Sequence, residues 1–514
     1  MSISTSPSTG TPTHRADPFG TAALLRLAAP LVVSVACFAL TLFTDRTLLM
    51  WFDPQQSGAS MAAGNLYWTL VCVPITALGF VTPLVAAASA GTGRGVRNPA
   101  ARLIRKQRFA ALVWQTLWIT LAIVPVLLAI AVAAPSIFAA AGHDASLAAE
   151  EAIYLRRLMW VAPASMLEAG LSGYFVGRRI TGPILWINIA TAILNVLLDA
   201  WLIFGGLGVP ALGIAGAAMA TAIAMWFKSS VYLMMIIRTP SFRRGSFAIN
   251  RSDDSSATAV WRPNRTIMAE IMWPGSTLGI GQLVRSGLMS YVLMGIGSVS
   301  IVGLAASTAA MSLYQLIAIP MIGLATAVTV LVSQATGMSG GTALDDDRRA
   351  PAERPSSAGS IILRGVRVGG VYMAAFAVVM LLAPDTLLRI SIGPVSDQNL
   401  SVYAAARPLL MIAAVYGLSD VVVLIVTAGL KGLGWTMSLL LSICFAAVLA
   451  WSFSLLESAI SGGGVIFWWI VLLVWVAGQA AAIAATAAAK SRRLSSRTTL
   501  WKGRPVATGT VAVR

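Results

Sequence analysis

The chain has 514 residues, of which 57% are hydrophobic and only 11% are charged, and its mean hydropathy is +0.81. A soluble domain carries about 25% charged residues, so the composition excludes a water-soluble protein and predicts one that lies mostly in lipid. The formal net charge of +17 does not indicate a nucleic-acid partner, because the basic residues stand in short clusters between apolar runs, as in the loops of membrane proteins.

The predicted elements begin after a polar tail. Residues 1–20 are rich in Ser, Thr and Pro, and we interpret them as a disordered cytoplasmic tail rather than a signal peptide. A helix needs about 20 apolar residues to cross the bilayer. The apolar runs therefore predict an all-α polytopic membrane protein with about twelve transmembrane helices, at about 22–50, 61–90, 109–134, 153–177, 183–204, 214–237, 270–297, 303–336, 364–388, 403–430, 434–457 and 465–489.

Charge alternates from loop to loop along these predicted spans. Arg and Lys gather in every second loop and in the C-terminal tail, whereas intervening loops such as 53–60 and 298–302 have almost none. Basic loops stay on the cytoplasmic side. We therefore expect a multi-pass protein of the cytoplasmic (inner) membrane with both termini in the cytoplasm.

The two halves of the chain resemble each other weakly. LVAAASAGTG at 84–93 is similar to LVSQATGMSG at 331–340, about 250 residues later. Such a repeat favours two six-helix lobes related by a pseudo-two-fold axis along the membrane normal. The predicted units are an N-lobe at 21–237, a cytoplasmic inter-lobe loop at 238–268, a C-lobe at 269–489 and a basic cytoplasmic tail at 490–514.

A few ionisable residues stand deep in the predicted spans, where a charge is costly and usually faces a cavity or a partner. They are Asp45, Glu168, Asp199, Arg285 and Asp420. Asn195 and Asp199 are four residues apart and share a helix face. Their oxygens are ligands suited to a proton or a sodium ion. Tyr416 and Asp420 repeat this spacing in the second half. The alternative is that each acid is hydrogen-bonded for packing alone.

The residues that most enzymes use are scarce. The two histidines, His14 and His143, fall in the tail and in a predicted loop, and the three cysteines lie inside apolar runs without ligand-like spacing. We therefore expect neither an enzyme nor a cofactor.

The stretch NVLLDAWLIFGGLGVPALGIAGAAMAT at 195–221 resembles the fifth-to-sixth-helix signature of the multidrug and toxic compound extrusion (MATE) transporters, of the MOP flippase superfamily. APLVVS and FTDRTLLM resemble that family's first helix, LEAG around Glu168 its fourth, and YGLSD with TAGLKGLG its tenth. The resemblance implies a two-lobed fold with a central cavity. It also implies a monomer that exports small lipophilic or cationic compounds in exchange for H+ or Na+.

The resemblance also implies roles for particular residues. Asp45, Asn195, Asp199 and Thr221 would form an N-lobe cation site, and Pro30 would mark a bend of the first helix that accompanies protonation. Tyr416 and Asp420 match a C-lobe cation site. In one branch of the family this C-lobe site includes a glutamate, and the matching position of this chain is Gln282, which cannot ionise. Arg285 follows one turn later and could pair with Asp420. The N-lobe site is therefore favoured.

Two other functions remain open from the sequence. A lipid-linked precursor flippase of the same superfamily would hold pyrophosphate with several deep cations, of which Arg285 is the one candidate selected here. An integral-membrane enzyme would need acids or histidines clustered at a membrane surface. A channel or receptor is not favoured by the two-fold repeat.

Overall fold

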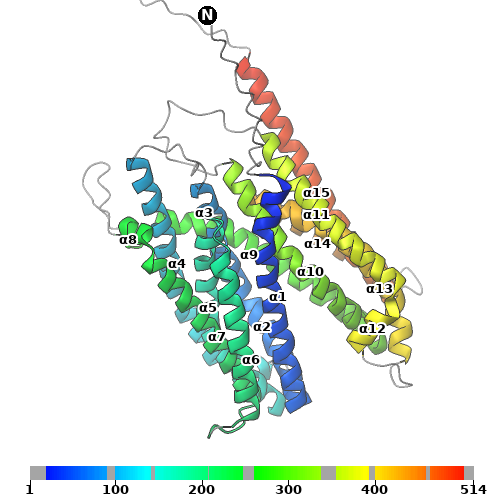
Figure 1. Ribbon diagram of the computed structural model, residues 1–514. Helices are drawn as coiled ribbons and strands as arrows, with labels where there is room; N and C mark the ends of the chain where they lie inside the picture. The colour runs from blue at the N-terminus through cyan, green and yellow to red at the C-terminus, as the bar shows by residue number, and fades with distance from the viewer. Residues whose placement is uncertain are drawn as a thin grey trace, which may run out of the picture.

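The computed structural model describes residues 19–89, 99–140, 145–206, 208–246, 260–336, 355–392, 400–458 and 464–502. Within these ranges the chain is built from α-helices, and the predicted all-α fold is confirmed (Figure 1). Most of the predicted N-terminal tail and part of the predicted inter-lobe loop lie outside the described residues.

Twelve membrane-crossing segments can be followed through the described residues. The second of them consists of two helices, α2 and α3. In chain order the segments are α1 (Thr21–Phe52), α2 (Pro54–Leu78) with α3 (Val81–Ser89), α4 (Pro99–Ala140), α5 (Ala145–Val176), α6 (Gly182–Phe204), α7 (Ile214–Arg238), α9 (Arg265–Val299), α10 (Ile301–Thr336), α11 (Pro355–Leu382), α13 (Leu400–Gly432), α14 (Thr436–Ser454) and α15 (Gly464–Lys502).

Ten of these segments, within the described ranges, are long and apolar enough by themselves to cross a membrane. The other two, α5 and α9, have 32 and 35 residues and are therefore long enough to span about 30 Å. Both carry more polar residues, such as Glu168 and Arg285. Both pack inside the bundle, α5 against α2, α4 and α7, and α9 against α2 and α14.

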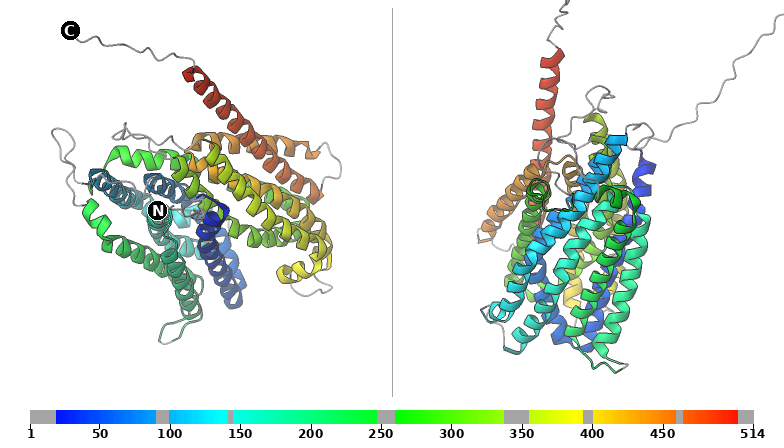
Figure 2. Two further views of the ribbon diagram at one scale, coloured as in Figure 1. Left: turned by 45° about the horizontal axis from the view of Figure 1, so that its top comes forward. Right: turned by 90° about the vertical axis from the view of Figure 1, so that its left-hand side faces the viewer.

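Some local details of the helices differ from the spans predicted from the apolar runs. Pro83 lies in the first turn of α3 and has no N–H to donate to the carbonyl of Gly79, so the second span breaks there. Two short helices, α8 (Pro240–Ser246) and α12 (Pro384–Ile392), were not predicted. The last helix continues to Lys502, beyond the predicted span, and its end projects past the bundle (Figure 2, red).

The helices form two lobes that meet along α1 and α10, α2 and α9, and α3 and α10. Glycines allow close approach here: a Cβ on Gly323 of α10 would lie 2.6 Å from the backbone nitrogen of Val32 of α1. Polar contacts also join the lobes, at the end where α1 begins. There Gln334 Nε2 donates to the Gly177 carbonyl at 2.9 Å, and Arg108 pairs with Glu270. Figure 1 shows the lobes spreading apart from this end, so that α6 and α12 are separated at the other.

The connection between α6 and α7 fixes the position of both helices. Gly205 and Gly213 have φ angles of 80° and 52°, in the left-handed region that favours glycine. Directly after Gly213, the backbone N–H of Ile214 at the start of α7 donates to Gln56 Oε1 of α2 at 2.7 Å. The first N–H groups of a helix have no partner within the helix, and Gln56 supplies one here. The register of α7, and therefore of Thr221, is set by these contacts.

Candidate functional site

A cavity of about 660 Å³ lies mainly within the N-lobe. Its walls come from α1, α2, α5, α6 and α7, and α10 of the C-lobe adds Gly323 and Thr326. The apolar part of the lining includes Phe38, Leu42 and Trp68. The charged groups in the lining are Asp45, Glu168 and Lys228. The cavity therefore combines an apolar wall with a few charges, as small-molecule sites do.

Two of the predicted acids meet beside this cavity. The carboxyl groups of Asp45 on α1 and Asp199 on α6 are close enough to interact electrostatically. Asp45 lines the cavity and accepts a long hydrogen bond, 3.5 Å, from Thr221 Oγ1. Asp199 is completely buried. When both carboxyls are ionised, neither has a hydrogen to offer the other, and both oxygens of Asp199 lack a donor among the described residues.

Asn195 lies one turn before Asp199 on the same face of α6 and is 1% exposed. Both polar atoms of its side-chain amide have no hydrogen-bond partner among the described residues. Buried polar groups nearly always have a partner, so an unpaired amide beside an unpaired carboxyl indicates a site that takes a further group. The structure thus brings Asp45, Asn195, Asp199 and Thr221 together in the N-lobe.

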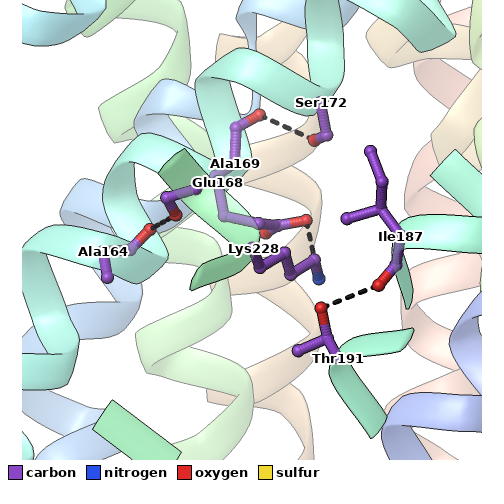
Figure 3. Close-up of polar contacts among 8 residues, drawn as sticks. Ala164, Glu168, Ala169, Ser172, Ile187, Thr191 and Lys228 are labelled. Carbon is purple, nitrogen blue, oxygen red and sulfur yellow. Dashed lines mark hydrogen bonds and ion pairs between the residues drawn. The ribbon is translucent and has the colours of Figure 1, made fainter. Parts of the chain in front are cut away.

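The cavity also contains an ion pair that the sequence analysis did not predict. Lys228 Nζ of α7 lies 3.1 Å from Glu168 Oε1 of α5, and Figure 3 shows the two side chains pointing toward each other. The sequence analysis selected Glu168 and missed Lys228. The signal was available, because Lys228 stands ten residues before the end of α7, inside a predicted span. A lysine in a span often extends to the membrane surface, but this one is buried.

The predicted C-lobe residues also come together, with a different arrangement of charge. Asp420 Oδ1 of α13 lies 3.6 Å from Arg285 Nη1 of α9, and Asp420 Oδ2 accepts a hydrogen bond from Tyr314 at 2.5 Å. Tyr416 packs edge-on against the Tyr314 ring. Gln282 is half-buried one turn before Arg285. In contrast to the acid pair of the N-lobe, Asp420 already has a cation and a donor.

Arg285 has further partners that the sequence analysis missed. Its Nη2 donates to Gln479 Oε1 of α15 at 3.3 Å, and its guanidinium lies 5.1 Å from the centre of the Trp475 ring. Both partners are nearly 200 residues away in the chain, and no local pattern marks them. The arginine is therefore held by the C-lobe itself.

Pro30 lies inside α1, which continues through it from Thr21 to Phe52. The hydroxyl of Ser34 donates to the Pro30 carbonyl at 2.7 Å. The next two residues, Leu31 and Val32, contact Gly323 of α10. Pro30 therefore stands directly before the contact between the lobes.

Comparisons with known proteins agree with this architecture. The MatE family model matches residues 278–456. A probable multidrug resistance protein NorM of Pseudomonas putida is 26% identical over 442 residues, covering 84% of this chain and 87% of the relative. The corresponding protein of Bradyrhizobium diazoefficiens is 26% identical over 448 residues, covering 87% of each chain.

Solved structures share the fold over nearly the whole chain. An outward-facing structure of a multidrug resistance MATE family transporter of the MOP superfamily superimposes with a TM-score of 0.74 at 17% identity, over 94% of this chain and 97% of that one. A MOP superfamily transporter from Pyrococcus furiosus, described as having a binding pocket of reverse polarity, gives a TM-score of 0.73 at 19% identity with the same coverage. The partial match of the MatE family model, the NorM relatives and the two-lobed helical fold together support a membrane transporter of the MATE type.

Proposed function

We propose that this transporter exports small lipophilic or cationic compounds in exchange for protons, by alternating access of its two lobes. The relatives are named as probable multidrug resistance proteins, which supports export of foreign compounds. The observation that carries the exchange is the closeness of the carboxyls of Asp45 and the buried Asp199 at the edge of the cavity.

The reason is electrostatic. Two carboxylates that share a buried site cannot both remain ionised without a compensating charge. A proton between Asp45 and Asp199 removes one charge and supplies the missing hydrogen bond. A cationic compound in the adjoining cavity supplies the compensating charge in another way, so that substrate binding favours release of the proton. Asn195 and Thr221 then orient and solvate whichever form is present.

The cavity suits such an exchange. Its 660 Å³ falls within the range of about 300–1,000 Å³ that is usual for small-molecule sites. Apolar side chains such as Phe38 and Trp68 line it together with Asp45. An amphipathic compound can therefore bury its apolar part while its cationic group lies near the acid pair.

The lobe contacts support an orientation. The end where α1 begins carries many of the basic residues, including Arg102, Arg105, Arg178 and Arg243, and we assign it to the cytoplasm by the positive-inside rule. Because the lobes contact each other at this end, the conformation would open to the outside. Both termini would then be cytoplasmic in the inner membrane, and Pro30 would be placed where bending of α1 can part the lobes.

A lipid-linked precursor flippase is the alternative that the sequence left open. Such a protein would use its deep cations to hold a pyrophosphate. Arg285 is paired with Asp420 and donates to Gln479, and Lys228 is paired with Glu168. Because the charge of each cation is already matched by an acid, this alternative is not favoured.

The test is efflux of a fluorescent cation from proteoliposomes. With a pH gradient imposed, wild-type protein should drive efflux, and Asp199→Asn should reduce it to the level of empty liposomes because the acid pair no longer exchanges a proton. Asp385→Asn is the matched control, since this acid lies on α12 beside Arg407, away from the cavity. Undiminished efflux in Asp199→Asn would refute the proposal, and efflux that responds to a sodium gradient alone would assign the exchange to sodium.

A further inference from the structure

The turn between α5 and α6 holds one residue in a strained backbone conformation. Arg179 has a φ angle of 60°, and among the described residues it is the one residue other than glycine with a positive φ. The turn is a Schellman motif, in which the Ile180 N–H donates to the Phe175 carbonyl and the Arg179 N–H to the Val176 carbonyl, both at 2.9 Å. Glycine is the usual residue at this position, because a Cβ is unfavourable in the left-handed region.

The C-lobe contains the corresponding turn, and there the position is a glycine. α5 and α6 are the fourth and fifth spans of the N-lobe, and α13 and α14 are the fourth and fifth spans of the C-lobe. Between α13 and α14 the Trp435 N–H donates to the Leu430 carbonyl and the Gly434 N–H to the Lys431 carbonyl, both at 3.0 Å. Gly434 has a φ angle of 76°. The same turn is therefore built twice, and the N-lobe copy has an arginine where glycine is sufficient.

The side chain of Arg179 reaches the opposite lobe. Its Nε donates to Gln334 Oε1 of α10, and Gln334 Nε2 donates to the Gly177 carbonyl, directly after α5, at 2.9 Å. The oxygen and the nitrogen of the glutamine amide thus both bind this one turn. The last carbonyls of a helix have no partner within it, so a C-lobe side chain completes the hydrogen bonding at the end of an N-lobe helix.

The start of α1 joins the same cluster of contacts. The Arg179 guanidinium lies 5.6 Å from the centre of the Phe19 ring, two residues before α1. Arg364 of α11, in the C-lobe, donates to the Phe19 carbonyl at 2.5 Å. Arg179 therefore contacts the C-lobe and the beginning of the helix that carries Asp45. The lobes cannot part at this end unless its bond to Gln334 breaks.

We propose that Arg179 is the central residue of a cytoplasmic latch, which holds the lobes together at the end where α1 begins and sets the balance between the outward-open and inward-open conformations. This inference rests on the proposed function, because a latch of this kind serves alternating access. The arginine remains in a strained conformation because its side chain stabilises the closed cytoplasmic end. Arg179 does not line the cavity, so its role is to position the lobes.

The latch is tested by measuring how far the lobes part at the opposite end, where α6 and α12 are separated (Figure 1). Ala200 of α6 and Thr386 of α12 are both exposed. Spin labels are attached to Ala200→Cys and Thr386→Cys in the full-length chain, with its three native cysteines replaced by alanine. Double electron–electron resonance on the reconstituted protein gives the fractions with a long and a short distance, without substrate or gradient. The wild-type protein should show mainly the long distance.

The variant Arg179→Gly gives the N-lobe turn the residue of its C-lobe counterpart. It should shift the ratio of short to long distances about tenfold toward the short one, the effect of losing one hydrogen bond to a charged group. Its melting temperature should stay close to that of the wild-type protein, because glycine suits the turn. Gln334→Ala removes the other half of the contact without changing the turn and should give a similar shift.

Arg178→Ala is the matched control. It removes the same charge from the same turn, but the Arg178 guanidinium lies 4.8 Å from the ring of Tyr174 in its own lobe. Its ratio of distances should stay within about twofold of the wild-type ratio. The inference is overturned if Arg179→Gly and Gln334→Ala keep the wild-type ratio, or if Arg178→Ala shifts it as much as they do.

The distances are measured apart from transport, so the two proposals can fail separately. A latch that responds as expected, in a protein whose efflux does not respond to a pH gradient, would refute the proposed function alone. Unchanged distances in Arg179→Gly and Gln334→Ala, in a protein that couples efflux to the pH gradient, would refute this inference alone.

Discussion

At the scale of single residues, three acids inside the bundle are compensated in three ways. Asp199 faces another carboxyl, Glu168 faces a lysine, and Asp420 faces an arginine and a tyrosine. These differences separate the acids by function. An acid with a permanent counter-ion gains little from a proton, whereas an acid that faces another acid requires one.

This distinction predicts different effects for equivalent substitutions in the two lobes. Asp420→Asn should retain most of the gradient-driven efflux, in contrast to Asp199→Asn, because Asp420 is already neutralised by Arg285. Initial efflux rates of the two variants, normalised to the amount of reconstituted protein, provide the comparison. Loss of efflux in Asp420→Asn equal to that in Asp199→Asn would place coupling in both lobes.

The same pair also allows a stability test. Arg285→Met leaves Asp420 buried without its cation and should lower the free energy of unfolding in detergent by roughly 2 kcal/mol, less than for a fully buried pair because Arg285 is partly exposed. Adding Asp420→Asn should recover most of the loss. Thermal unfolding of the two single variants and the double variant measures the coupling between these residues. Additive effects would show that the two side chains do not interact.

The acids themselves could be predicted from the sequence, because a charge stands out in an apolar span. Most of their partners could not. Tyr314 and Asp420 are 106 residues apart, and Arg285 and Gln479 are 194 apart. Pairings of this kind depend on how helices pack, and a hydropathy pattern contains no information on which faces meet. Lys228 is the exception, since its position in a span was visible.

At the scale of helices, the positions of the twelve spans were predictable because length and apolar composition determine them. Their breaks and ends were not. An average of hydropathy over the second span does not register the break before Pro83, and the helix of α15 continues past its apolar part to Lys502. Helical hydrogen bonding continues in water where propensity allows, so the end of an apolar run need not be the end of a helix.

Two glycines of α9 differ in whether packing requires them. A Cβ on Gly275 would lie 2.4 Å from the Ala77 carbonyl oxygen of α2, whereas nothing lies within 4 Å of a Cβ on Gly287 of the same helix. We therefore expect Gly275→Ala to cost about 1–3 kcal/mol of stability through overpacking. Gly287→Ala should change stability by less than about 1 kcal/mol. Melting temperatures in detergent compare them, and equal values would show that the α2–α9 contact does not require glycine.

At the scale of the whole molecule, the two-lobed architecture is the one that the weak repeat between the halves predicted. The lobes are nevertheless unequal in chemistry. The N-lobe holds the cavity with the acid pair and the Glu168–Lys228 pair, whereas Arg285 of the C-lobe is engaged by Asp420, Gln479 and Trp475. This asymmetry favours exchange in the N-lobe, with the C-lobe as the body against which it moves.

The central claim is that binding of a cationic compound displaces a proton from the acid pair of Asp45 and Asp199. It is tested most directly by counting protons released into weakly buffered detergent solution, with a pH indicator, when a saturating cationic dye is added to the purified transporter. We expect the wild-type protein to release about one proton per bound dye near neutral pH, because two facing carboxyls retain one proton between them, and Asp199→Asn to release far less at equal occupancy. Release of no proton by the wild-type protein, or equal release by Asp199→Asn, would contradict the account.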